Sequence, residues 1–169
     1  QKFFFFDIDN TLAVWPEGKI PNSAQYCIDE LQRRGHLVSL ATGRIQVDAM
    51  RFAEQAGIRN VVADGGHSIT IDGKLVSMIG MNRDMCIQYL EYLESKHIPW
   101  AVTDRNKLGR ITPYKEILDW HPGWDVFKTI VEPEFDFHSV DDFYKIYVFF
   151  KDGEEEEKDI EHMTRSEER

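Results

Sequence analysis

Four consecutive phenylalanines near the start of the chain run directly into the acidic segment Asp7-Ile8-Asp9. A short, unbroken apolar run of this kind is typical of a strand that is buried on both faces, as in a parallel sheet. We therefore predict a strand over residues 3–8. In open parallel sheets, ligands bind beyond the carboxyl ends of the strands, so Asp7 and Asp9 are candidates for a functional site.

The next residues alternate between helix and strand patterns. The expected elements are a helix that begins at Asn22 or Ser23 and ends before Gly35, a strand over 37–41, a helix over 45–56 and a strand over 60–63. An order of strand, helix, strand, helix, strand requires parallel strands with right-handed crossovers. The sequence therefore predicts an α/β core of the Rossmann type.

A change of composition near Gly80 predicts a boundary between two units. Most glycines precede it and most aromatic residues follow it. The first unit ends in a hairpin about Asp72-Gly73, with strands over 68–71 and 75–79. In the second unit we expect helices over 84–97 and 154–165, strands over 100–103 and 143–150, and short helices and loops over 106–142. This second pattern predicts an α+β module.

The residues at the strand ends suggest metal and phosphate chemistry. Asp7 and Asp9 would repel each other at one strand end, and a divalent cation relieves that repulsion. Oxygen ligands of this kind favour Mg²⁺, and such a carboxylate pair can supply a nucleophile and a general acid–base. The second strand ends in Thr42-Gly43-Arg44 before a helix, where a hydroxyl, an amide and a helix N-terminus form an anion site. Arg44 either contacts a bound phosphate or pairs with the site carboxylates.

Two segments resemble the first and second motifs of the haloacid dehalogenase (HAD) superfamily: residues 3–12, which contain Asp7-Ile8-Asp9-Asn10-Thr11, and residues 41–44, Ala-Thr-Gly-Arg. Residues 63–66, Ala-Asp-Gly-Gly, with the hairpin after them, resemble the Cof-type (subfamily IIB) hydrolases of that superfamily. The resemblance implies a HAD-like, Rossmann-type parallel-sheet core with an inserted α+β cap domain.

The same resemblance implies an enzyme, a Mg²⁺-dependent phosphatase that acts on a small phosphorylated metabolite through an aspartyl-phosphate intermediate. Asp7 would be the nucleophile, and Asp9 would protonate the leaving alcohol and then activate water. The Asp7 carboxylate and the Asp9 backbone carbonyl would bind Mg²⁺. Thr42 and the amides of Ile8 and Gly43 would hold the phosphoryl oxygens, and such a site acts by positioning and charge neutralisation.

The chain departs from the family pattern at several points. Asn10 stands where many relatives have Gly, although Asn tolerates a left-handed backbone, and Asp64 stands where many have Asn. The family's later lysine and later acidic motif are not found, and Lys145 lies in the cap without the expected context. We therefore expect residues 1–80 to be the N-terminal part of the core and residues 81–169 an incomplete cap. The C-terminal half of the core would lie outside a truncated sequence, which alone would be inactive.

Composition excludes some partners. The 169 residues carry 30 acidic and 20 basic side chains, for a formal net charge of −10. This balance argues against nucleic acid or an anionic membrane as partner, and no apolar run approaches the ~20 residues of a membrane span. Two cysteines fit a reduced, cytoplasmic setting. The sequence defines no oligomeric state.

Other functions stay open at this point. A sugar-phosphate mutase would use the same paired motifs, a phosphoacceptor signalling domain would be phosphorylated at Asp64, and a binding module would not be catalytic. Trp100, Trp120 and Trp124 could line a substrate pocket, although such residues are more often core. His67 could touch substrate, although a loop histidine is the simpler interpretation.

Overall fold

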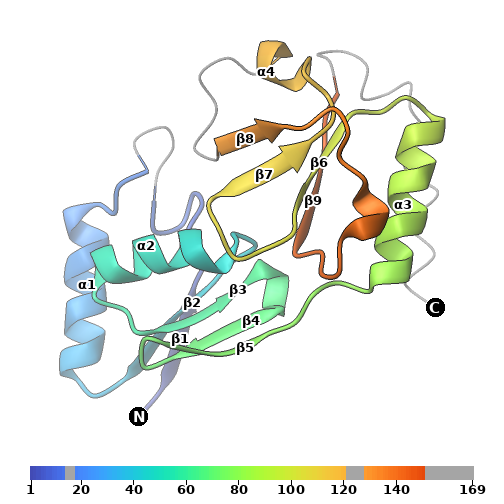
Figure 1. The fold of residues 1–169 in the computed structure, drawn as a ribbon. Helices are drawn as coiled ribbons and strands as arrows, with labels where there is room; N and C mark the ends of the chain where they lie inside the picture. The colour runs from blue at the N-terminus through green and yellow to red at the C-terminus, as the bar shows by residue number, and fades with distance from the viewer. Residues whose placement is uncertain (14–17, 121–127, 151–169) are drawn as a thin grey trace.

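The computed structural model describes residues 1–13, 18–120 and 128–150, which form two β-sheets with helices packed against them (Figure 1). We call the sheet within residues 3–78 the core sheet and the sheet within residues 100–148 the cap sheet. The helix expected over 154–165 and the side chain of Trp124 lie outside the described residues.

The core sheet has five strands in the order of the sequence: β1 (Phe3–Phe6), β2 (Leu37–Ala41), β3 (Asn60–Ala63), β4 (Ser68–Ile71) and β5 (Lys74–Met78). The first three strands are parallel, as predicted, and β4 and β5 join them antiparallel. Asp72 and Gly73 form the tight turn of the hairpin, with φ of 51° and 75°. Positive φ at both central residues matches the right-handed twist of the flanking strands.

Two helices form the crossovers between the parallel strands. These are α1 (Asn22–Arg33) and α2 (Gln46–Ala56), and the side-chain amides of Gln25 and Gln32 on α1 donate to backbone carbonyls at the end of α2. Gly57 ends α2 with φ of 66°, as its place after the helix pattern predicts. The helices and strands enclose an apolar cluster that includes Ile28, Leu40 and Val61.

The phenylalanine run is not buried on both faces in the part of the chain that the structure describes. Phe4 and Phe6 are partly buried, whereas Phe3 is 64% and Phe5 59% exposed. In the described part of the chain β1 lies at the edge of the core sheet, and right-handed crossovers between successive neighbouring strands place α1 and α2 on the same face, so no described helix covers the other face. The strand also ends at Phe6 rather than at residue 8.

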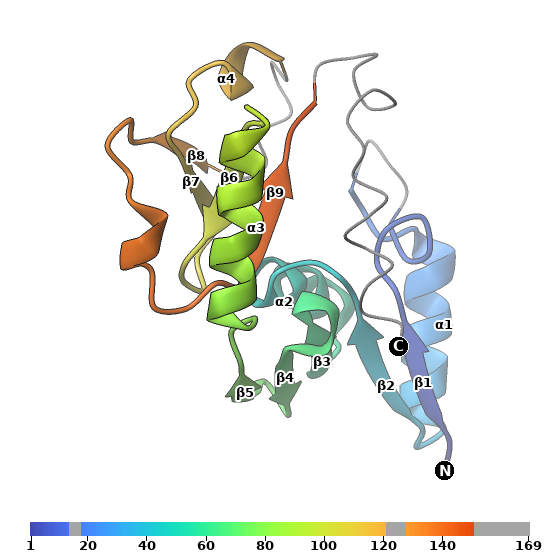
Figure 2. The same cartoon turned by 90° about the vertical axis from the view of Figure 1, so that its right-hand side faces the viewer.

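The cap sheet has the strand order β8-β7-β6-β9. The cap elements are α3 (Arg83–Ser95), β6 (Trp100–Thr103), β7 (Gly109–Thr112), α4 (Ile117–Trp120), β8 (Lys128–Val131) and β9 (Lys145–Val148). Figure 2 shows α3 lying along one face of this sheet. Two short 3₁₀ turns, Asp64–Gly66 and Phe137–Ser139, complete the described elements.

In the cap, the prediction for residues 106–142 is wrong, and the interpretation of Trp100 as a core residue is confirmed. The sequence predicts only short helices and loops over residues 106–142, yet these contain β7 and β8. The strand β7 pairs with the buried strand β6, and β8 pairs with β7, so this pairing rather than a local pattern decides their conformation. Trp100 is fully buried and belongs to the cap core with Leu90, Leu93 and Phe143. Trp120 is half-buried. None of the helices in the described part of the chain has the length and apolar character needed to cross a membrane.

Candidate active site

The loop after β1 presents two aspartates on either side of a buried residue. Ile8 is fully buried, whereas Asp7 and Asp9 are exposed. The Ile8 carbonyl accepts the amides of Leu12 and Ala13 at 3.0 and 2.8 Å, which curls the loop back on itself. This turn requires a left-handed residue, and Asn10 supplies it with φ of 58°.

The loop after β2 lies next to the first loop, because β1 and β2 are parallel neighbours. Thr42 is buried, and its hydroxyl oxygen accepts the Arg44 amide at 3.2 Å, so the hydroxyl proton stays available to a ligand. Gly43 is exposed. Within the described residues, neither the Ile8 amide nor the Gly43 amide has a hydrogen-bond acceptor. The two loops therefore offer the donors that the sequence predicted for phosphoryl oxygens.

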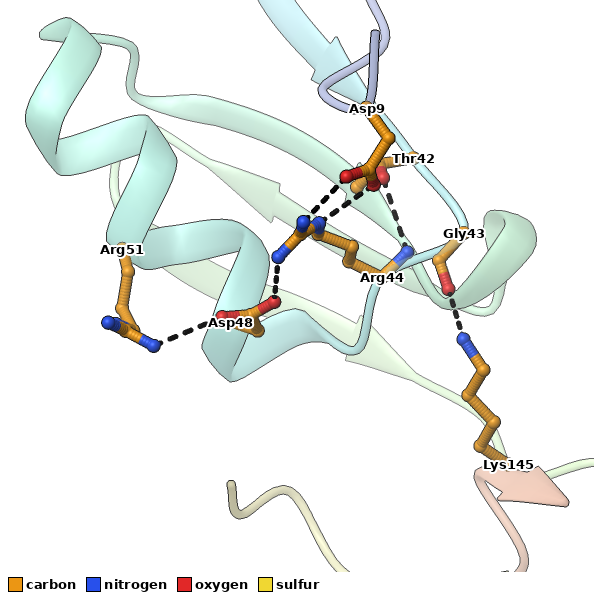
Figure 3. A network of polar contacts seen from close by, with 7 residues as sticks. All are labelled: Asp9, Thr42, Gly43, Arg44, Asp48, Arg51 and Lys145. Carbon is orange, nitrogen blue, oxygen red and sulfur yellow. Dashed lines mark hydrogen bonds and ion pairs between the residues drawn. The ribbon is translucent and has the colours of Figure 1, made fainter. Parts of the chain in front are cut away.

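The guanidinium of Arg44 pairs with two carboxylates, those of Asp9 and Asp48 (Figure 3). Its guanidinium binds Asp9 through two hydrogen bonds of 2.8 and 2.6 Å, and it binds Asp48 at 2.6 Å. The hydrogen bonds from Arg44 lower the pKa of Asp9. Asp48 is fully buried and also pairs with Arg51 at 3.3 Å. The sequence predicted that Arg44 either contacts a bound phosphate or pairs with a site carboxylate, and the structure has the ion pair with Asp9.

The start of α2 is already occupied by protein groups. The Gln46 amide donates to Asp64 Oδ2 at 3.1 Å, and the Val47 amide donates to Asn106 Oδ1 at 3.1 Å. The helix N-terminus, which the sequence suggested as part of the anion site, therefore holds Asp64 and a cap residue instead. Burial raises the pKa of Asp64, and its Oδ1 has no hydrogen-bond partner in the described part of the chain.

Lys145 reaches this site from the cap, and the sequence did not predict its place there. Its Nζ donates to the Gly43 carbonyl at 2.9 Å. Local sequence holds no signal for this contact, because it joins residues 102 positions apart. It arises from the antiparallel pairing of β9 with β6, which sets Lys145 opposite Thr103 at the end of the cap sheet that meets the core.

The metal ligands predicted from the sequence fit Mg²⁺ in part. The Asp7 carboxylate and the Asp9 carbonyl oxygen have no hydrogen-bond or ion-pair partner among the residues described. Both are oxygen donors, and Mg²⁺ is commonly held by one or two carboxylates together with waters and substrate phosphate. No cluster of three or more His, Cys, Asp or Glu side chains suited to a metal occurs in the described ranges.

A separate hollow of about 670 Å³ lies on the cap. It is lined by α3, the loop after β7 and the segment around Phe137, and includes Glu94, Trp100 and Tyr114. It contains none of the core residues described above, so the phosphate chemistry predicted from the motifs does not belong there.

The arrangement of a mixed α/β core with a second, α+β sheet unit is that of solved HAD-like hydrolases. One is a haloacid dehalogenase-like hydrolase from B. subtilis, with a TM-score of 0.75 and 22% identity, covering 99% of this chain and 68% of that one. Another is the HAD subclass IIB sugar phosphatase BT4131, with a TM-score of 0.68 and 18% identity, covering 93% of this chain and 62% of that one. At these identities the likeness establishes the fold.

The family follows from the sequence comparison. The model of the haloacid dehalogenase-like hydrolase family matches residues 4–169, and this chain belongs to that family. A Bacillus subtilis (strain 168) protein named "Putative phosphatase YkrA" is 25% identical over 158 residues, which cover 92% of this chain and 60% of that protein. The chain thus spans about three fifths of the length of this relative.

Proposed function

We propose that the protein is a Mg²⁺-dependent phosphomonoesterase that hydrolyses a small phosphorylated metabolite through an aspartyl-phosphate intermediate. The observation that carries the proposal is the Asp7 carboxylate at the carboxyl end of β1, which has no partner among the described residues. The Ile8 amide in the same loop and the Gly43 amide in the loop after the neighbouring strand β2 also have no acceptor there. A nucleophile next to preorganised donors is what phosphoryl transfer requires, because catalysis rests on positioning and on stabilising charge on the phosphoryl oxygens.

Each residue has a defined part in the proposed reaction. An Asp7 oxygen attacks phosphorus, the bond to the leaving oxygen breaks, and Asp9 gives that oxygen its proton. Asp9 then takes a proton from water, which attacks the phosphorus of the aspartyl phosphate and releases inorganic phosphate and the Asp7 carboxylate. Thr42 and the amides of Ile8 and Gly43 hold the phosphoryl oxygens throughout.

The ion pair with Arg44 constrains the role of Asp9. A general acid must carry a proton, and the hydrogen bonds from Arg44 lower the pKa of Asp9, which favours the carboxylate. We infer that Arg44 leaves Asp9 when substrate binds and turns toward the phosphoryl group, so that Asp9 becomes free to hold a proton. In the structure Asp48 also pairs with Arg51 at 3.3 Å, so the buried carboxylate would keep one partner.

Mg²⁺ would be held by the Asp7 carboxylate and the Asp9 carbonyl, and it would neutralise negative charge on the phosphoryl group. The division into a core over 1–80 and a cap over 81–169, with the other half of the core outside this sequence, is part of the proposal. It predicts that residues 1–169 alone bind Mg²⁺ weakly and lack activity.

The test uses the complete natural protein and a generic aryl phosphate as substrate. Asp7→Asn should abolish turnover because an amide is no nucleophile, and Asp9→Asn should slow it by roughly 10²–10⁴. Asp84→Asn, an exposed aspartate on α3, is the matched control and should leave the rate unchanged. Acid quenching during turnover should trap phosphate on wild type and not on Asp7→Asn. Full activity of Asp7→Asn, or activity unaffected by a chelator, would contradict the proposal.

A rival function, phosphorylation of Asp64 in a signalling domain, has less support. Asp64 is only 9% exposed, and one of its oxygens already accepts the Gln46 amide. A phosphodonor would need access to that carboxylate, whereas Asp7 is exposed.

A further inference from the structure

Lys145 is a cap residue whose charged end lies in the core. It is the first residue of β9, opposite Thr103 of β6, and the Tyr144 amide before it donates to the Thr103 carbonyl at 2.9 Å. The side chain crosses to the core and donates to the Gly43 carbonyl at 2.9 Å (Figure 3). Gly43 lies between Thr42 and Arg44, so the ammonium stands at the loop that we propose holds phosphate.

The ammonium of Lys145 has more N–H donors than acceptors among the described residues. A lysine ammonium carries three N–H donors, and among the described residues the Gly43 carbonyl is its one hydrogen-bond acceptor. No carboxylate in the described part of the chain lies within the 4.0 Å of an ion pair. The Tyr147 ring centre lies 5.6 Å from Nζ and offers only its face. As far as the described residues go, at least two N–H groups are therefore without an acceptor and open to a ligand.

The surroundings of Lys145 favour an anion. The side chain is half-buried, and burial lowers the pKa of Lys145 while the nearby Asp64 carboxylate opposes that change. A partly desolvated cation without a close partner gains more from a bound anion than a solvated one, because water screens it less. Asp48 and Asp9 also act on the ammonium at longer range, and Arg44 opposes them. A phosphoryl dianion at the Gly43 loop would give the ammonium a directly bonded negative partner, which the described residues do not supply.

We propose that Lys145 is a substrate-binding residue through which the cap donates a charged hydrogen bond to the phosphoryl group held by the Thr42-Gly43-Arg44 loop. This inference rests on the proposed function for its site and goes beyond it in assigning a cap residue to the phosphoryl group. It makes binding of the anion depend on contact between cap and core, since Lys145 and the loop belong to different sheets.

A purely structural role is the main alternative, and the chain offers a matched residue to test it. Asn106, also from the cap, accepts the Val47 amide at 3.1 Å and donates to Gln46 Oε1 at 2.7 Å. It joins cap to core near the same loop but carries no charge. If Lys145 only holds the cap in place, removal of either residue should weaken anion binding to a similar extent.

The experiment measures inorganic phosphate on the complete protein, both by calorimetry and as a competitive inhibitor of aryl phosphate hydrolysis. Lys145→Met should weaken phosphate binding roughly 10- to 100-fold, the range expected for one lost charged hydrogen bond, and should raise KM more than it lowers kcat. Lys145→Arg should recover most of the affinity. Lys128→Met, an exposed lysine on β8, should match wild type, and Asn106→Ala should stay within about threefold of wild type.

Two results would overturn the assignment: phosphate binding by Lys145→Met within about twofold of wild type, or an equal loss in Asn106→Ala. Thermal melting of each variant identifies any that fail to fold, in which case Lys145→Arg and Lys145→Gln decide. Phosphate binding without hydrolysis in wild type would refute the proposed function, and the calorimetric comparison would still decide the role of Lys145. A wild-type protein that binds no phosphate would refute both.

Discussion

Breaking the contact between Arg44 and Asp48 should destabilise the core strongly. Asp48 is 0% exposed, and its shorter ion pair, 2.6 Å, is with Arg44, which is 22% exposed. Removal of one partner from a buried pair costs about 3–5 kcal/mol, because the other charge is left in a poor environment. Here Arg51 remains 3.3 Å from Asp48 and is itself 57% exposed, so it compensates only in part. We expect Arg44→Met to lower the free energy of unfolding by about 2–3 kcal/mol.

The assay is urea unfolding of Arg44→Met, Asp48→Asn and the double variant. With typical m-values of about 1–3 kcal/mol/M, the Arg44→Met midpoint should fall by roughly 1 M or more. The double variant should be more stable than the sum of the single losses predicts, by about 1–2 kcal/mol, because a neutral amide at position 48 no longer needs a cation. Arg33→Met removes an exposed partner of Glu30 and is the control, with little expected change.

Additivity of the two single variants within about 0.5 kcal/mol would refute this reasoning. It would mean that Asp48 does not depend on Arg44 and that the buried pair contributes no more than a surface one.

Three further results are expected. Trp100→Ala should lower the free energy of unfolding by roughly 3–5 kcal/mol in urea titrations, because it empties a fully buried site in the cap core; a change below about 1 kcal/mol would contradict that burial. Gly57→Ala should lower the free energy of unfolding by about 1 kcal/mol in the same titrations, because the φ of Gly57 is +66°. Gly43→Ala should leave that free energy almost unchanged, because Gly43 is outside the left-handed region and an added Cβ meets nothing within 4 Å. Equal losses for the two variants would contradict this reasoning. His138 should titrate by NMR above its ordinary pKa of about 6.5, because its ring bonds to Glu91 and Asp136 raise the pKa. The stabilisation from these bonds is then complete below about pH 6.5 and is lost as the pH rises through the folded-state pKa, and Glu91→Gln should lower the midpoint.

The sequence by itself was sufficient for features that depend on near neighbours. The helices α1 and α2, the parallel strands β1 to β3 and the Asp72-Gly73 hairpin were all predicted, because amphipathic periodicity and turn residues act over a few positions. The family was evident for the same reason, since each motif is a short, continuous segment at the end of a strand.

Only the tertiary structure decided what those segments meet. The ion pair of Arg44 with Asp9, 35 positions away, and the hydrogen bond from Lys145 to Gly43 join residues from separate elements. The energy of such contacts depends on distance and burial that no local pattern contains. The exposure of Phe3 among the described residues has the same cause, because the residue types predict a strand, whereas the placement of the helices determines which of its faces they cover.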